Sequence, residues 1–376
     1  MNIRALLGLG YLVGIACLGI KSTVADTLQV PTSDPNIVYS PYNWFQSGKD
    51  YAQSPNPGSY VKLAFTGTSI GVKLDVSPLT NAKVPDAQYP VIRYSIDAGP
   101  ATTTQLTPTT STITCAKGLQ EGNHTLLIQY VAGYVFLDFW TPVNAVKVSG
   151  FTLDEGAKTI PSLGTQKRNA LFLGDSITNG DDDIATFTGG ITNAVDTQDA
   201  TIGYPSIVAA GTRSEYGVAA YGGASWGSNA ADGHTPGLMT FWSMIDKDHS
   251  RLRDGKLSPL PDDIYVNMGE NRPPNGDDVP KLITNLRGAS NSSTNIFMIV
   301  PFSGRARAQV TSGVTEYQAK NASDKNVYLI DLGYQPYLSS GPTMKSVDGQ
   351  HPLAGLHAEL GAQIVAERAR LLSRQK

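Results

Sequence analysis

The chain has few cysteines, few charged residues and no long apolar run beyond its N-terminus. Its two cysteines are Cys17 and Cys115. If the N-terminal segment is removed, Cys115 alone remains, no intrachain disulfide can form, and Cys115 is interpreted as a small buried apolar residue. A chain of 376 residues with 40% hydrophobic residues can rely on its core instead. The low charged fraction of 16% and net charge of −3 argue against a strongly basic nucleic-acid-binding protein.

The first 25 residues have the pattern of a secretory signal peptide. Arg4 precedes an apolar run over 5–20, and the small residues of 23–25 provide a cleavage site after Ala25. An uncleaved membrane anchor and a lipoprotein modified at Cys17 are the alternatives. No later window is apolar enough to span a bilayer. We therefore expect a secreted or periplasmic protein with no stable membrane insertion after signal cleavage.

Short segments of alternating polarity dominate the first part of the mature chain. Turn-forming residues separate them, which is typical of an antiparallel β-sandwich, here of jelly-roll type. The predicted strands are 60–65, 70–74, 91–96, 125–130 and 145–148. The Thr-rich stretches 102–104 and 107–114 are too short for a glycosylated stalk and are compatible with a polar edge strand, and no helical periodicity is visible. The sequence predicts a sandwich domain over residues 26–160.

The pattern changes after a linker at 156–164. Short apolar runs are now separated by helix-sized spacers, which indicates an α/β domain with a doubly wound parallel sheet over residues 167–376. The predicted strands are 170–173, 217–220, 264–268, 296–300 and 327–331. Leu356, Leu360, Ile364 and Leu371 have near-helical spacing and predict a C-terminal helix against the sheet. Ligands of such sheets bind beyond the carboxyl ends of the strands.

The most informative segment is 174–180, with the sequence GDSITNG. It follows an apolar strand and places Ser176 where a helix begins, beside free backbone N–H groups and the positive end of a helix dipole. A nucleophile that attacks a carbonyl needs this environment. The alternative is an ordinary helix cap, for which Asp and Ser are common residues.

A base for this serine is offered by the segment 348–352, DGQHP. A neutral His351 imidazole can take the serine proton, while Asp348 can hold the other ring nitrogen and stabilise the imidazolium. The chain has five histidines, and two others also follow an acid by three residues. Only His351 combines the acid with a proline and a following helical stretch.

Two further segments predict donors for a developing oxyanion. Asn271 follows an apolar strand in the sequence MGEN, and its side-chain amide can point into the same edge of the sheet. Gly223 lies in YGGASWG after another strand, where glycine lets a backbone N–H approach a ligand closely. Ordinary turns are the alternatives for both, and Gly222 is the alternative to Gly223.

Taken in chain order, these segments resemble the SGNH (GDSL-type) hydrolase superfamily, over roughly residues 167–376. The resemblance implies a flavodoxin-like sheet with Ser176 as nucleophile, His351 as base and Asp348 as its orienting acid. It also implies an oxyanion hole from the amides of Ser176 and Gly223 and the side chain of Asn271. Arg272 departs from the pattern, because an aspartate is usual there, and this puts the hydrogen bonding of its loop in doubt.

A small β-sandwich ahead of such a domain resembles the family 2 carbohydrate esterases, which remove acetyl groups from plant polysaccharides. The resemblance implies a serine esterase acting on an acetylated polysaccharide or oligosaccharide, with no cofactor and no metal. The acidic run 181–183 is interpreted as a solvated loop. Trp226 is predicted to line the acyl or sugar site, with packing in the core as the alternative.

Other activities are compatible with the same residues, because fold does not fix substrate. A lipase, thioesterase or arylesterase uses the same triad, although the sequence has no long apolar lid. A polysaccharide O-acyltransferase also uses it and excludes water. A carbohydrate-binding protein with an inactive hydrolase domain is opposed by the intact Ser176, Asn271, Asp348 and His351.

Overall fold

The structure, a computed structural model, describes residues 27–162, 164–184, 194–333, 346 and 348–374. The predicted signal peptide and Cys17 lie outside the described residues. Within the described ranges, no helix is long and apolar enough to cross a membrane.

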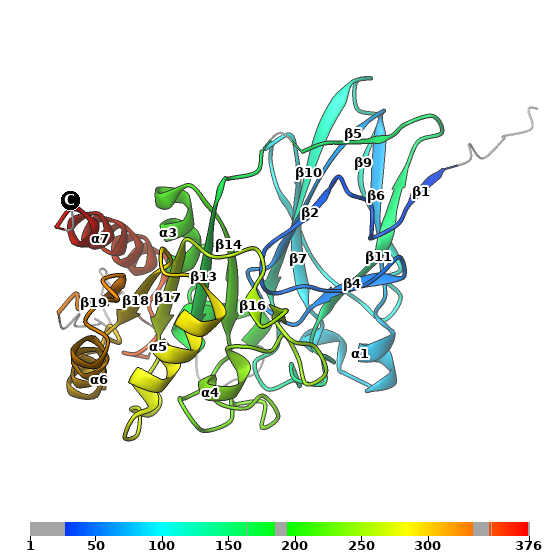
Figure 1. The fold of residues 1–376 in the computed structure, drawn as a ribbon. Coiled ribbons are helices and arrows are strands. Elements are labelled where there is room, and N and C mark those ends of the chain that lie inside the picture. The colour runs from blue at the N-terminus through cyan, green and yellow to red at the C-terminus, as the bar shows by residue number, and fades with distance from the viewer. Residues whose placement is uncertain (1–26, 163, 185–193, 334–345, 347, 375–376) are drawn as a thin grey trace, which may run out of the picture.

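Two antiparallel sheets form the N-terminal sandwich (Figure 1). One sheet has the order β3-β4-β11-β6-β9, with β1 paired to β11, and the other has the order β12-β5-β10-β7-β8, with β2 paired to β5. The strands of the first sheet are β1 (Leu28–Val30), β3 (Phe45–Ser47), β4 (Tyr51–Ser54), β6 (Ser69–Leu74), β9 (Thr112–Lys117) and β11 (Val146–Leu153). Those of the second are β2 (Ile37–Tyr39), β5 (Tyr60–Thr66), β7 (Val91–Ile96), β8 (Thr102–Gln105), β10 (Asn123–Ala132) and β12 (Thr159–Ile160).

The alternating segments therefore form strands as expected, because one face of each sheet packs on the other. Phe65, Val72 and Phe151 are fully buried between the sheets. The stretch 102–104 lies in β8 and the end of 107–114 lies in β9, and both are edge strands, whereas residues 107–111 form a turn before β9. Cys115 on β9 is a free thiol at the margin of this core, only partly buried.

The sequence reading missed the short elements of this domain. The helix α1 (Ser77–Asn81) and the 3-10 turn η1 (Asp86–Gln88) connect β6 to β7. Five residues are too few to show a helical period, and Pro78 in the first turn is the only local signal. The three-residue strands β1, β2 and β3 are likewise too short for alternation to be visible.

The second domain is built on a five-stranded parallel sheet with the order β14-β13-β17-β18-β19. This is the flavodoxin-like 2-1-3-4-5 order, so the predicted fold class is confirmed. The strands are β13 (Arg168–Gly174), β14 (Ser214–Ala220), β17 (Asp263–Asn267), β18 (Asn295–Ile299) and β19 (Val327–Ile330). Each contains most of one of the predicted apolar runs. A two-stranded ribbon, β15 (Leu252–Arg253) and β16 (Lys256–Leu257), lies outside the sheet.

Helices cover both faces of this sheet (Figure 1). The larger ones are α3 (Tyr204–Thr212), α5 (Asp278–Ala289), α6 (Arg307–Lys320) and α7 (Ala354–Ser373), and the short ones are α2 (Ser176–Asn179), α4 (Leu238–Phe241) and the 3-10 turn η2 (Ala194–Thr197). Phe172 packs with the α3 and α7 side, whereas Leu171 and Leu173 pack with the α5 and α6 side. Both faces of each strand are therefore buried, which explains the continuous apolar runs.

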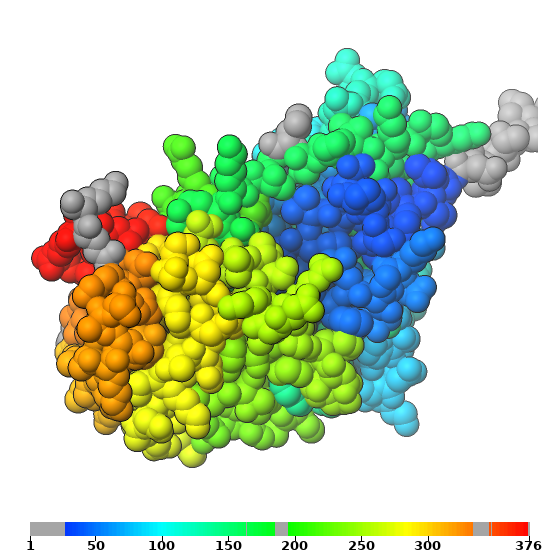
Figure 2. Space-filling view, in the orientation of Figure 1, coloured from blue at the N-terminus to red at the C-terminus, as the bar shows by residue number. Residues whose placement is uncertain are grey.

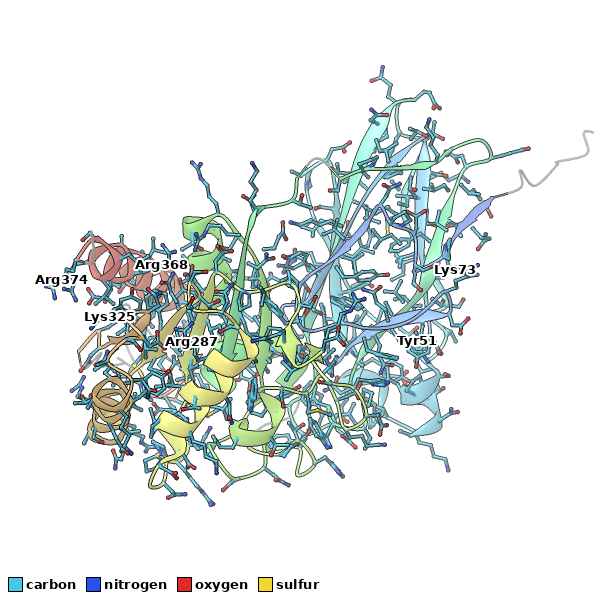
Figure 3. The ribbon with its side chains drawn as sticks, in the orientation of Figure 1. Tyr51, Lys73, Arg287, Lys325, Arg368 and Arg374 are labelled. Carbon is cyan, nitrogen blue, oxygen red and sulfur yellow. The ribbon has the colours of Figure 1, made fainter. Side chains whose placement is uncertain are left out.

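Arg368 of α7 and Arg287 of α5, both labelled in Figure 3, form ion pairs with carboxylates near the amino ends of the strands. Arg368 of α7 donates from Nε to Asp263 at the start of β17, with a distance of 3.0 Å. Arg287 of α5 pairs with Asp324, in the segment before β19, at 2.8 Å.

The two domains share an extensive contact, and Figure 2 shows no gap between them. Phe139, from the β10–β11 connection, is 1% exposed and belongs to the same core as Leu171 of the parallel sheet. Arg93 on β7 pairs with Asp199 of the α/β domain at 2.6 Å. Residues of the predicted linker form β12, which extends the sandwich by pairing with β5.

Candidate active site

Ser176 lies at the start of α2, directly beyond the carboxyl end of β13. The strand ends at Gly174, where a side-chain methyl group would lie 2.0 Å from Thr178 Oγ1, so only glycine allows this sharp turn. Asp175 caps the helix by accepting a bond from the Ile177 amide at 3.3 Å. The serine is 4% exposed and is thus nearly enclosed.

The loop before α7 brings the imidazole to this serine. His351 Nε2 lies 2.8 Å from Ser176 Oγ, and His351 Nδ1 lies 2.6 Å from Asp348 Oδ2. The other carboxylate oxygen of Asp348 accepts the backbone amides of Gln350 and His351 at 2.8 and 2.7 Å. The structure therefore brings all three predicted triad residues together in the order that proton transfer requires.

The electrostatics of this pair favour the imidazolium–carboxylate state. Burial favours a higher pKa for the Asp348 carboxyl, but the hydrogen bond and charge of His351 hold that pKa well below its usual range. Burial lowers the pKa of His351, whereas the hydrogen bond to Asp348 raises this pKa. This hydrogen bond and the negative charges of Asp181 and Asp182 outweigh burial and raise the His351 pKa to about 9.

Asp182 is a second carboxylate close to the imidazole. Its Oδ2 lies 3.8 Å from His351 Nδ1, and its backbone has a φ of 57°, a left-handed conformation that is unusual for a non-glycine residue. Asp182, Asp348 and His351 each place a ligand atom within 4.8 Å of the others. A cation there would compete with the hydrogen bond between His351 and Asp348. The expectation that no metal takes part stays a prediction.

The three residues predicted to supply oxyanion donors lie around one cavity. Asn271, Gly223 and Ser176 all line one cavity of about 210 Å³, together with His351. Gly223 has a φ of +73°, and a side chain there would also collide with Ala231, 2.9 Å away. Asn271 Nδ2 donates one hydrogen to Ala224 O at 2.9 Å, which fixes the amide and leaves its second N–H available.

The loop that carries Asn271 is supported although it lacks the usual aspartate. Arg272 donates to Ser228 Oγ at 3.1 Å. The buried Glu270 accepts a bond from Ser303 Oγ at 2.5 Å, and Arg305 donates to the Glu270 carbonyl at 2.7 Å. These bonds resolve the doubt that Arg272 raised.

Comparison with known proteins agrees with this architecture. The family model described as carbohydrate esterase 2 N-terminal matches residues 46–162. A family two carbohydrate esterase from Cellvibrio japonicus is similar with a TM-score of 0.73 and 16% identity, over 94% of this chain and 100% of that chain. This chain has the two-domain fold of the family 2 carbohydrate esterases.

Two further solved structures share this fold. An acetyl xylan esterase from the rumen bacterium Butyrivibrio proteoclasticus has a TM-score of 0.72 and 15% identity, over 93% of this chain and 99% of that chain. A family two carbohydrate esterase from Clostridium thermocellum in complex with cellohexaose has a TM-score of 0.70 and 20% identity, over 90% and 99%. No curated protein sequence matches the chain. The resemblance predicted from the sequence is confirmed for the fold.

One predicted site residue lies elsewhere in this family 2 fold. Trp226 is 1% exposed, packs in the core of the α/β domain and donates from Nε1 to the Met268 carbonyl at 3.2 Å. It does not line the cavity, so the predicted substrate contact is corrected to a core position. The indole supports the strand end that precedes Asn271.

Sequence reasoning missed the residues that complete the cavity. Val135 and Phe136 come from the sandwich domain, and Asp181 and Thr197 come from the segments after α2 and before α3. Gly222 is also structural, because a side-chain methyl group there would lie 2.1 Å from Val135 Cγ2. The interpretation of 181–183 as a solvated loop is wrong, because Asp181 and Asp183 are buried. Neither this segment nor 133–145 has a sequence pattern that distinguishes it from an ordinary loop.

Proposed function

We propose that this protein is a secreted serine esterase that removes acetyl or other short acyl groups from a polysaccharide or oligosaccharide. The observation that carries the proposal is the bonded chain from Ser176 through His351 to Asp348. It opens into a cavity that also holds Gly223 and Asn271. If Ser176 were only an ordinary helix cap, there would be no reason for its hydroxyl to be buried and in contact with an imidazole.

The reaction begins when Ser176 Oγ attacks the ester carbonyl carbon while His351 Nε2 takes the hydroxyl proton. The oxyanion accepts hydrogen bonds from the backbone amides of Ser176 and Gly223 and from the Asn271 side chain. The carbonyl then re-forms, the carbon–oxygen bond to the sugar breaks, and the imidazolium gives its proton to the departing hydroxyl. Asp348 holds the imidazole throughout.

Water completes the cycle. It attacks the acyl-enzyme carbonyl while His351 takes a proton from it, and collapse of the second oxyanion returns the proton to Ser176 and releases the acid. The size of the cavity, about 210 Å³, supports a short acyl group. The similar structures include an acetyl xylan esterase and a carbohydrate esterase in complex with cellohexaose, which supports a carbohydrate as the alcohol part.

The test is acid release from acetylated xylan and from ethyl acetate by the mature protein and by Ser176→Ala. We expect acetate from both esters with the wild type and none above background with the variant. Release from ethyl acetate alone would keep the serine mechanism and reject the polysaccharide. Transfer of acetyl to an added sugar, without free acetate, would instead favour the acyltransferase. A folded wild type inactive on both esters would contradict the proposal.

A further inference from the structure

The cavity beside Ser176 has one wall that belongs to the sandwich domain. Phe136 lines it and is 44% exposed. Among the described residues it is the one aromatic side chain that combines a large size with such exposure. Its ring meets Tyr134 in a T-shaped arrangement, with 5.7 Å between ring centroids, and the exposed part of the ring lines the cavity.

The loop that presents Phe136 is held by both domains. Gly133 donates its amide to Gln198 Oε1 at 2.9 Å, and Asn144 Nδ2 donates to the Tyr134 carbonyl at 2.8 Å. Val135 fits against the bare backbone of Gly222. An exposed aromatic ring on so well anchored a loop resembles a preformed contact surface rather than a mobile side chain.

Asp181 supplies a polar group to the same cavity. Its Oδ1 accepts the side-chain amides of Asn179 and Gln198 at 2.8 and 2.9 Å. Its Oδ2 lies on the side of Gly222, where a side-chain methyl group would approach it to 2.5 Å. Gln198 thus fixes both the phenylalanine loop and this carboxylate, and it leaves one acceptor oxygen for a ligand in the cavity.

We propose that Phe136 and Asp181 form the subsite for the sugar ring that bears the ester. A pyranose has an apolar face of C–H groups and an edge of hydroxyl donors. Its face can stack on Phe136, and a hydroxyl can donate to Asp181 Oδ2. The inference rests on the proposed esterase function and adds that selectivity for a sugar over a simple alcohol depends on one residue from each domain.

The test compares kcat/KM for a methyl xylopyranoside monoacetate with kcat/KM for ethyl acetate, which has neither a ring nor further hydroxyls. We expect this ratio to fall about tenfold in Phe136→Ala and in Asp181→Asn. The asparagine keeps an oxygen for the Asn179 and Gln198 amides and changes only the oxygen offered to the ligand. Leu28→Ala, an exposed apolar residue of β1 in the same domain, is the matched control and should leave the ratio unchanged.

A second readout separates the subsite from the chemistry. Xylotriose binding, followed by NMR titration, should weaken about tenfold in Phe136→Ala relative to wild type. The proposed subsite would be rejected if the ratio of the two kcat/KM values were unchanged in both variants, or if Phe136→Ala did not weaken xylotriose binding. Hydrolysis of ethyl acetate that depends on Ser176 would then still stand. Sugar binding that depends on Phe136 in a protein that hydrolyses neither ester would retain the subsite and reject the esterase.

Discussion

The two domains contribute to the active site in different ways. In the α/β domain, Ser176 follows β13 and Asn271 follows β17, so the predicted catalytic groups lie directly beyond the carboxyl ends of buried strands. In the sandwich domain, the cavity residues Val135 and Phe136 lie in the long connection after β10. The comparison teaches that the predicted catalytic groups lie at the ends of regular strands, whereas the wall proposed to contact the substrate comes from a loop of the other domain.

The domains also differ in how their cores are closed. The sandwich encloses its own core between two sheets, but the α/β core includes Tyr42 and Phe139 from the sandwich. Arg251 is buried and donates a hydrogen bond to the Tyr42 carbonyl. The α/β domain thus depends on its partner for packing as well as for the cavity wall.

The largest expected effect is on catalysis, from changes in the α/β domain alone. His351→Ala should lower kcat about 10⁶-fold, and Asp348→Asn about 10⁴-fold, because each removes the proton acceptor or its correct tautomer. Ester hydrolysis measured beside Glu155→Gln, an exposed acid of the sandwich, checks this. A comparable loss of kcat in Glu155→Gln, or only a mild loss in His351→Ala, would contradict the assignment of the catalytic groups to the α/β domain.

The second effect concerns the shared core. Phe139→Ala should lower the free energy of unfolding by about 3–5 kcal/mol, because it removes a buried ring at the domain contact. Phe136→Ala, three residues away but exposed, should change it by less than about 1 kcal/mol. Calorimetry should show one transition that moves as a whole. Two separate transitions, with only one affected, would mean that the domains are independent.

The third effect tests the oxyanion hole. Asn271→Ala should lower kcat about 10²–10³-fold with a smaller change in KM, since the amide acts mainly on the transition state. Asn229, whose side chain donates to Gly233 on the surface of the same domain, provides the matched control Asn229→Ala. Equal effects of the two substitutions on kcat would exclude Asn271 from the oxyanion hole.

Particular residues show how far the sequence could predict this molecule. Strands such as β7 and β17 were readable because burial of one or both faces imposes alternation or an apolar run. Ser176, Asn271 and His351 could be predicted as candidate site residues because they lie next to such strands or to the C-terminal helix. Phe136 and Asp181 were not, since their roles depend on how two domains meet. Trp226 was misplaced because an indole beside a glycine turn suits a cavity wall and a core equally well.

A smaller effect is expected on stability. Burial raises the pKa of Asp181 to about 7 and that of Asp183 to about 9, so each folded-state carboxyl holds its proton above the unfolded value. Stability should therefore fall as pH rises from about 4 through these values. The raised pKa of His351 acts in the same direction, because its contribution is lost as pH rises toward 9.

The melting temperature should accordingly be several degrees higher at pH 5.5 than at pH 8.5. Asp183→Asn should reduce that difference, because it removes a buried carboxyl that must ionise. Glu155→Gln, at an exposed position, should leave it unchanged. A melting temperature that rises with pH over this range would contradict the burial of these acids in the folded state.

The smallest effect is on the pH dependence of catalysis. The base form of His351 is needed for attack, so kcat/KM should rise with pH toward the pKa of about 9. Asp182→Asn removes a charge 3.8 Å from His351 Nδ1 and should move this limb to lower pH by less than about one unit. If Asp182 has only a structural role, Asp182→Asn should change the rate but leave the pH at which kcat/KM rises unchanged.

The most direct test of the account is to trap the nucleophile. A small phosphonate ester should add one covalent group, which peptide mass spectrometry should locate on Ser176. Labelling should be absent in Ser176→Ala and strongly slowed in His351→Ala, because the imidazole activates the hydroxyl. A label on another residue, or equal labelling of Ser176 without His351, would contradict the central claim that these two residues act as one nucleophilic unit.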